Sequence, residues 1–343
     1  MIRLLLVLSL LGGLLSCQSP PSVSRHEFMA FGTLVSLSFY GLDGEAASRA
    51  TAAAMEDFRY LHSAWHPYEP GPLGRVNELL PLQGWFTYPP SLRPLLLRAR
   101  ELSRASGGLF NPAIGELVML WGFHEDPRRE GPPPDPKAVA EWVAAAPSLE
   151  DVELRGLEMR SRNPRVRLDF GAFAKGYGVD RVIEHLRELG VENAIVNAGG
   201  DLRAIGSKGG APWVVGIRDP RGPGVLARIA VSGDESVFTS GDYERFFEYE
   251  GRRYHHILDP RSGYPARGLV SVTVVAGEGA LADAAATALM VAGPEDWPQV
   301  ARAMGVEQVM VIEEGGGIQL TPAMVRRLQW EKPVPEPRVR PLP

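Results

Sequence analysis

The segment LDFGAFAKGYGVD, residues 168–180, is the most informative stretch of the chain. It leads from a short predicted strand around Val166 into a helix that we expect over residues 176–189. Small residues let a backbone approach a ligand closely, and the start of a helix offers free N–H groups. Asp169 and Lys175 bracket this point with opposite charges. The residues alone fit either a ligand-binding turn or a tight turn with a surface ion pair.

Two polar motifs follow downstream. TSGDY (239–243) places hydroxyls and a glycine beside a carboxylate at a predicted turn, and HHILDPRSGYP (255–265) presents a histidine pair before an Asp-Pro turn. A histidine near a carboxylate can act as a general base or orient a hydroxyl. A histidine beside an Asp-Pro turn more often only caps local backbone, so both interpretations stay open here.

Asp283 and Thr287 stand four residues apart on a helix that we predict over residues 280–292, so their oxygens share one face. A carboxylate, a hydroxyl and nearby carbonyls suit Mg²⁺ better than Zn²⁺. The alternative is that Asp283 only stabilises the helix dipole. GEGALA (277–282) also matches a dinucleotide fingerprint, but no βαβ unit places an acidic residue about 20 positions beyond it.

The bulk composition excludes some classes of protein. The chain has 343 residues, is 45% hydrophobic and 22% charged, and carries a formal net charge of −5. It can therefore fold as one large domain or two modest ones. No basic face is evident, so we expect no nucleic-acid partner. Neither a G-x-x-x-x-G-K-[ST] loop nor a G-x-S-x-G elbow occurs.

The N-terminus resembles an export signal. An arginine at position 3 precedes an apolar run over residues 4–15, which is too short to span a bilayer and fits a signal of residues 1–16. LLSC (14–17) looks like a bacterial lipobox that would lipidate Cys17, the only cysteine of the chain. The alternative is a plain secretory signal. Residues 17–25 are predicted to be a tether to the membrane.

Periodicity predicts an α+β fold with mixed, largely antiparallel sheets and packed helices, in one catalytic unit over residues 26–330. Residues 125–136 are expected to form an exposed loop, and the proline-rich residues 331–343 a disordered tail. The further helices are expected at 45–61, 90–106 and 136–146, and the main strands at 34–40, 194–197, 213–217, 227–231, 243–249, 253–257, 270–276 and 309–312.

These segments together resemble the ApbE-type FAD:protein FMN transferases, from about residue 28 to residue 328. The matching motifs occur in the family's order: FGT (31–33), GGLFNP (107–112) with LWGF (120–123), LDFGAFAKGYGVD (168–180), VNAGGD (196–201), TSGDY (239–243), HILDPRSGYP (256–265) and DAAATA (283–288). Phe31 stands where the family usually has Met, and Phe can still pack on a ring system. Asn111 replaces the usual Asp, which puts an acid–base role for this position in doubt.

The resemblance implies a specific site. Asp283 and Thr287, with the backbone carbonyl of Ala172, would hold Mg²⁺ against the pyrophosphate of FAD. His256, Asp259 and Lys175 would be catalytic. The residues that would line the FAD site are Phe31, Trp65, Leu109, Phe110, Asn111, Asp169, Lys175 and His256.

The resemblance also implies an activity: Mg²⁺-dependent transfer of FMN from FAD to a Thr or Ser of an acceptor protein, with release of AMP. The same residues would serve an FAD pyrophosphatase, and a non-catalytic FAD-binding lipoprotein is a third hypothesis. The expected partners are FAD, a flavin-acceptor protein and, through the lipid, a bacterial membrane on its periplasmic or outer face.

Overall fold

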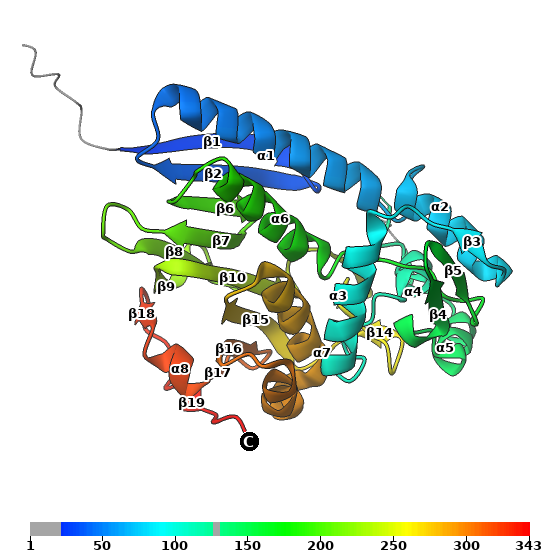
Figure 1. Cartoon of the computed structure of the whole chain (residues 1–343). Helices are drawn as coiled ribbons and strands as arrows, with labels where there is room; N and C mark the ends of the chain where they lie inside the picture. Colours follow the sequence, from blue (N-terminus) through cyan, green and yellow to red (C-terminus); the bar gives the residue numbers. More distant parts are fainter. Residues whose placement is uncertain (1–21, 126–130) are drawn as a thin grey trace, which may run out of the picture.

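The computed structural model describes residues 22–125 and 131–343, and a nine-stranded sheet forms its centre (Figure 1). Within these residues the neighbouring strands pair antiparallel, except that β17 and β19 pair parallel. The predicted α+β class is confirmed. In spatial order the strands are β1 (Val23–Ala30), β2 (Thr33–Tyr40), β6 (Ala194–Ala198), β7 (Asp201–Gly206), β10 (Gly233–Gly241), β15 (Leu269–Ala276), β16 (Gln308–Glu313), β17 (Ile318–Leu320) and β19 (Arg338–Val339).

The middle strands of the sheet are buried on both faces. Helices α1 (Gly44–Trp65), α3 (Leu92–Ala105), α6 (Ala174–Glu188) and α7 (Gly279–Met304) share a core with one face, and Figure 1 shows α1, α6 and α7 along it. A second sheet of β8 (Trp213–Arg218), β9 (Val225–Val231) and β18 (Leu328–Trp330) covers the other face. Along β15, Val272 and Val274 join the helical core while Val275 joins the second one, as strand alternation requires.

Smaller elements surround this centre. A satellite core contains Trp121, Trp142 and Tyr254. The remaining helices are α2 (Pro72–Leu79), α4 (Gly115–Leu120), α5 (Pro136–Ala145) and α8 (Pro322–Val325), and the remaining strands are β3 (Phe86–Thr87), β4 (Val152–Arg155), β5 (Glu158–Ser161), β11 (Phe246–Tyr249), β12 (Arg252–His255), β13 (Leu258–Asp259) and β14 (Tyr264–Pro265).

The predicted helices are all present, with shifted boundaries. α6 begins at Ala174, so Lys175 lies in its first turn instead of before it. α7 continues to Met304, beyond the predicted end at residue 292. It is interrupted at Gly293, which has a φ of 81° and precedes Pro294. A proline cannot donate a backbone hydrogen bond, so the helix kinks there and resumes.

The sequence prediction missed strand β10. It assigned TSGDY to a turn, whereas Thr239 and Ser240 lie on β10, between β7 and β15. Gly, Asp and Glu at its start are weak strand formers, so local preference argued against it. Pairing on both sides overrides that preference. The predicted strand over 243–249 is correspondingly shorter and begins at Phe246.

Both ends of the described chain differ from expectation. Residues 23–25 of the predicted tether belong to β1 and pair with β2. The predicted disorder of residues 331–343 is wrong for the segment that forms β19. Arg338 and Val339 lie between prolines, but they pair along β17. Arg340 N also donates to the carbonyl of Leu320, at 2.8 Å. The predicted signal peptide and Cys17 lie outside the described residues.

None of the helices in residues 22–125 and 131–343 is both long and apolar enough to cross a membrane.

Candidate functional site

The predicted metal residues Asp283 and Thr287 lie on α7, one turn apart. Asp283 is buried, and its Oδ2 accepts a hydrogen bond of 2.9 Å from the backbone N–H of Gly176, the third residue of α6. A Cβ at Gly176 would stand 2.2 Å from the carbonyl oxygen of Gly279, so only glycine allows this approach. α7 therefore places the carboxylate of Asp283 against the N-terminal end of α6. The residue that it bonds, Gly176, lies four residues after Ala172.

The oxygens around Asp283 fit a hard cation. Burial raises the pKa of Asp283, and the carboxylates of Asp201 and Glu244 add to that effect, while Lys175 opposes it. The hydroxyl of Thr287 lies 3.2 Å from that of Ser240. Oxygen donors in a region of surplus negative charge suit Mg²⁺.

A cation here would need help from other oxygens. Among the residues that the structure describes, no cluster of three or more His, Cys, Asp or Glu could enclose a metal ion. Mg²⁺ usually keeps waters and binds one or two carboxylates together with substrate phosphates. Asp283 and Thr287 would therefore be two of several oxygen ligands around such a cation.

Lys175 is held by a carboxylate that the sequence analysis gave no role. Its Nζ pairs with Oδ2 of Asp201, and the other oxygen of Asp201 accepts from the backbone N–H of Thr239 at 2.9 Å. Burial acts to lower the pKa of Lys175, but Asp201, Asp283 and Glu244 outweigh it and the pKa is raised. Lys175 is therefore a fixed cation. The signal that could have found Asp201 is its place after two glycines, where a strand begins.

The two neighbouring histidines have different surroundings. The buried His255 bonds the carbonyl of Ala266 through Nε2, at 2.8 Å. His256 is half-buried, and its Nδ1 lies 3.2 Å from the carbonyl of Arg245. A carbonyl can only accept, so Nδ1 carries the proton and Nε2 keeps a free lone pair. Burial and the nearby Arg245 and His255 lower the pKa of His256 to about 3, with a smaller contribution from Lys175.

Asp259 is occupied elsewhere. Its carboxylate accepts from the backbone and the guanidinium of Arg261, at 2.9 Å for Nη2. Arg261 also donates to the carbonyl of Val291 in α7, at 2.8 Å. Within the described residues, no hydrogen bond joins Asp259 to His256. Asp259 thus holds Arg261, which links the loop to α7.

Two of the predicted flavin-lining aromatics meet. The rings of Phe31 and Trp65 stack at 6.4 Å with an interplanar angle of 14°, and Tyr177 of α6 follows at 5.5 Å from Trp65. Phe31 has a φ of 50°, a left-handed conformation that costs a bulky residue about 1 kcal/mol or more. The turn between β1 and β2 therefore holds the ring of Phe31 beside the start of α6, although this backbone conformation is unfavourable for Phe.

Residues 109–111 make contacts within the protein that the sequence did not predict. Phe110 is buried and packs on Phe173, at 5.8 Å between ring centroids, while Leu109 is half-buried against the same core. Asn111 donates from Nδ2 to the carbonyl of Pro147, at 2.9 Å. A carboxylate could not make that bond, because it has no N–H to donate. The departure from the family's Asp thus has a structural use in this chain.

Asp169 stands next to these residues. Its backbone N–H donates to the carbonyl of Pro112, at 2.8 Å. Its carboxylate accepts from the hydroxyl of Tyr68 at 2.5 Å and from the N–H of Gly171 at 2.7 Å. Burial raises the pKa of Tyr68 well above its ordinary value, and Asp169 raises it further, so Tyr68 stays protonated. Asp169 thereby shapes the turn that leads into α6.

The dinucleotide fingerprint at GEGALA has no matching architecture. The strand before it, β15, pairs antiparallel with both β10 and β16, so it is not part of a parallel βαβ unit. The N–H groups of Gly279 and Ala280 are both bonded to Asp180. Gly279 of this segment instead allows the start of α7 to pack closely against α6.

Comparison with known proteins gives one family. A profile described as the ApbE family matches residues 31–310. The chain is 42% identical over 322 residues to the FAD:protein FMN transferase of Rhodobacter capsulatus, which covers 94% of this chain and 61% of that protein. It is 41% identical over 223 residues to the protein of the same name from Treponema pallidum, covering 60% of each. The chain thus spans less than two thirds of the length of these relatives.

Solved structures agree. The ApbE protein from Thermotoga maritima superposes with a TM-score of 0.81 at 30% identity, covering 91% of this chain and all (100%) of that one. The apo flavinyl transferase ApbE from Pseudomonas stutzeri gives 0.78 at 29% identity, covering 92% and 98%. By its sequence profile, its fold and its relatives, this chain belongs to the ApbE family.

Proposed function

We propose that this protein transfers FMN from FAD to the hydroxyl of a Thr or Ser on an acceptor protein, in a Mg²⁺-dependent reaction that releases AMP. The observation that carries the proposal is the meeting of the starts of α6 and α7, where Asp283 lies against the N-terminal end of α6. The name FAD:protein FMN transferase, which the relatives bear, supports it.

The metal would be held by the carboxylate of Asp283, the hydroxyl of Thr287 and the carbonyl of Ala172. When bound, Mg²⁺ supplies neutralisation of the charge on the pyrophosphate and on the departing AMP. The N-terminal end of α6 would offer the positive end of its helix dipole to the same phosphates. Lys175 adds a fixed positive charge in the first turn of α6.

The flavin would lie against the aromatic residues at the far end of this region. Phe31 and Trp65 offer stacked rings, and a ring system binds well on such a surface. Leu109 and Asp169 would border the pocket. Phe110 and Asn111 would support it from the core side, because both are engaged in internal contacts.

The chemical step is a displacement at the FMN-side phosphorus. The acceptor oxygen forms a new P–O bond, and the bond from that phosphorus to the bridging oxygen breaks, so AMP leaves with the bonding electrons. The hydroxyl proton goes to Nε2 of His256, whose lone pair is free because Nδ1 faces the carbonyl of Arg245. The lowered pKa keeps His256 neutral at neutral pH, so its Nε2 is unprotonated and can accept a hydrogen bond from the acceptor hydroxyl.

The test is mass spectrometry of an acceptor protein incubated with FAD, Mg²⁺ and the enzyme. A covalent FMN adduct is expected with the wild type and none with Asp283→Ala. The matched control is Asp296→Ala, which removes an exposed carboxylate from the same helix and should label normally. Free FMN and AMP without an adduct would identify a pyrophosphatase instead, and intact bound FAD would identify a non-catalytic binding protein.

We also propose that residues 1–16 direct export, that Cys17 carries the lipid and that residues 18–22 link it to the domain. Support comes from the lipobox-like LLSC and from the position of β1, which starts at Val23. Cys17→Ser should move the protein from the membrane fraction to the soluble fraction. Unchanged fractionation of that variant would contradict the anchor without touching the proposed activity.

A further inference from the structure

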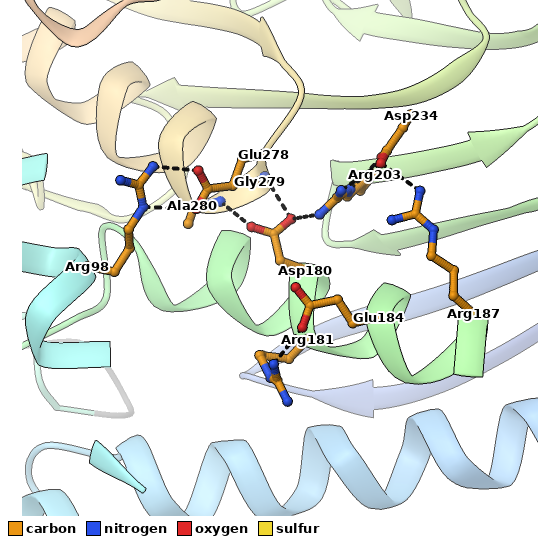
Figure 2. A network of polar contacts seen from close by, with 10 residues as sticks. All are labelled: Arg98, Asp180, Arg181, Glu184, Arg187, Arg203, Asp234, Glu278, Gly279 and Ala280. Atoms are coloured by element: carbon orange, nitrogen blue, oxygen red, sulfur yellow. Dashed lines mark hydrogen bonds and ion pairs between the residues drawn. The ribbon is translucent and has the colours of Figure 1, made fainter. Parts of the chain in front are cut away.

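The carboxylate of Asp180 joins the start of α7 to α6. Asp180 lies in the second turn of α6 and is buried, with 5% of its surface exposed. Its Oδ1 accepts from the N–H of Gly279 and its Oδ2 from that of Ala280, both at 2.8 Å. These are the first two residues of α7, whose N–H groups have no partner inside the helix. Figure 2 shows the carboxylate between the start of α7 and the side chain of Arg203.

The contact is reciprocal. Asp180 of α6 caps the start of α7, and Asp283 of α7 accepts from Gly176 near the start of α6. The backbones also touch, since a Cβ on Gly279 would stand 2.8 Å from the carbonyl oxygen of Gly176. Neither helix can slide or rotate without breaking one of these bonds. The position of Asp283 is therefore set by the bond that Asp180 makes one turn earlier.

Arg203 fixes Asp180 in turn. Its Nη1 donates to Asp180 at 2.6 Å, while Nε and Nη2 donate to Asp234 at 2.7 and 2.9 Å. Arg203 lies on β7 and Asp234 on β10, the same strands that carry Asp201 and Thr239. Arg203 thereby fixes the position of Asp180 relative to β7 and β10. The same two strands hold Lys175 in place through Asp201.

We propose that Asp180 is a positioning residue for the metal site: it holds the first turn of α7, and with it the proposed ligands Asp283 and Thr287, in place against α6. The carboxylate of Asp180 bonds Gly279, Ala280 and Arg203, so Asp180 would act through the position of α7 and not as a metal ligand. The inference rests on the proposed function, and it assigns the binding of Mg²⁺, not the chemistry, to this contact. Loss of an outer partner of a metal ligand weakens metal affinity by about 10–100-fold.

The test measures Mg²⁺ binding apart from turnover. FAD fluorescence is titrated with Mg²⁺ in the presence of the enzyme and without an acceptor. Asp180→Asn, which cannot accept from both amides, should raise the Mg²⁺ concentration for half of the response about tenfold or more. Excess Mg²⁺ should then restore FMN labelling of the acceptor. A purely structural role would lower the yield of folded protein without making activity dependent on added metal.

The matched control is Asp234→Asn. It disturbs the same guanidinium and also removes the pairing of Arg187, which donates to Asp234 at 2.6 Å, but it leaves the start of α7 untouched. Its Mg²⁺ titration should equal that of the wild type. Equal shifts in Asp180→Asn and Asp234→Asn would overturn the inference, because the effect would then come from the ion pairs of Arg203 and not from the contact with α7. An unshifted Asp180→Asn would overturn it as well.

A second pair of variants applies if Asp180→Asn does not fold. Gly279→Ala keeps the carboxylate but places a Cβ 2.8 Å from the carbonyl of Gly176 and 2.9 Å from Oδ1 of Asp180. It should show the same Mg²⁺ shift. Gly277→Ala, two residues earlier, meets nothing within 4 Å and should behave as the wild type. If the wild type itself shows no Mg²⁺-dependent response, the proposed function fails and not only this inference.

Discussion

Helix α1 and the pair α6 and α7 are capped in different ways. The residue before α1, Asp43, accepts from the N–H of Ala46 at 2.7 Å, so this helix carries its own cap. The residues before α6 and α7 make no such side-chain bond. Instead, the N–H groups of Gly176, Gly279 and Ala280 donate to carboxylates that lie 99 to 107 residues away in the chain.

The difference separates stability from function. A local cap stabilises one helix and has no further effect. A remote cap makes the start of one helix depend on the position of another, so it fixes geometry between distant parts of the chain. In this protein the remote caps lie at the proposed metal site, and one of them is Asp283 itself. The following predictions test that contrast.

The largest effect is expected for Lys175→Met. It leaves the buried carboxylate of Asp201 without its cation, which should lower the free energy of unfolding by about 3 kcal/mol. Urea unfolding measures this, and labelling should be lost as well. The double variant Lys175→Met/Asp201→Asn should regain most of the stability but not the labelling. Wild-type stability of the single variant would show that the charge pair is not needed for the fold.

The next effect tests the contact between the helix starts. Gly176→Ala forces a Cβ against Gly279 and Asp283, which should cost about 2 kcal/mol and weaken the Mg²⁺ response. Gly44→Ala is the matched change at the first residue of the locally capped α1, where nothing lies within 4 Å. It should leave both quantities unchanged. Equal losses in the two variants would remove the distinction between the two kinds of helix start.

Removal of the local cap should have a smaller effect. Asp43→Ala should lower the free energy of unfolding by about 1 kcal/mol while the FMN labelling rate stays at the wild-type value. Asp43→Ser keeps a capping oxygen and should recover most of the loss. A fall in labelling with Asp43→Ala would mean that α1 also positions the site.

The smallest effect concerns pH. His256 has its pKa lowered to about 3 by burial and by neighbouring cations, so it stays neutral where an ordinary histidine would charge. His256 should therefore contribute no acid limb to kcat/KM for labelling near pH ~6.5, the ordinary pKa of histidine. An acid limb at that pH, absent in a variant that alters only His256, would contradict the buried neutral state.

The lowered pKa of His256 also makes the free energy of unfolding depend on pH. The unfolded chain binds a proton to this histidine below its ordinary pKa, while the folded chain does not until about pH 3. The contribution of neutral His256 is fully present above the ordinary pKa and is lost as the pH falls from there towards 3. Replacement by Gln should thus flatten the fall in unfolding free energy below pH ~6.5. An unchanged slope would show that His256 protonates normally in the folded protein.

Local signals predicted much of the fold. The apolar alternation of β2 and the alanine-rich periodicity of α1 gave both elements nearly at their observed bounds. β10 was missed because its polar start has little strand preference of its own and its partners come from elsewhere in the chain. The edge strand β19 was missed because prolines on both sides suggested disorder.

The site was predictable only in part. The four-residue spacing of Asp283 and Thr287 placed them on one helix face correctly. The role of Asp201 depends on where β7 lies relative to α6, and no spacing in the sequence shows that. The ion pair of Asp259 with Arg261 was not predicted either, because an Asp-Pro turn does not show which side chain lies against it. Residue type and order predict which groups are available; tertiary contacts decide which of them are free to act.

The reciprocal capping of α6 and α7 has a consequence for how the site comes into being. Gly176 and Asp283 are 107 residues apart, and the bond between them exists only when both helices have docked. A chain that ends before α7 leaves the start of α6 uncapped and has neither Asp283 nor Thr287. Under the proposed function, an unfinished or truncated chain therefore lacks both side chains that would hold the metal, and the site is complete only when α7 has packed on α6.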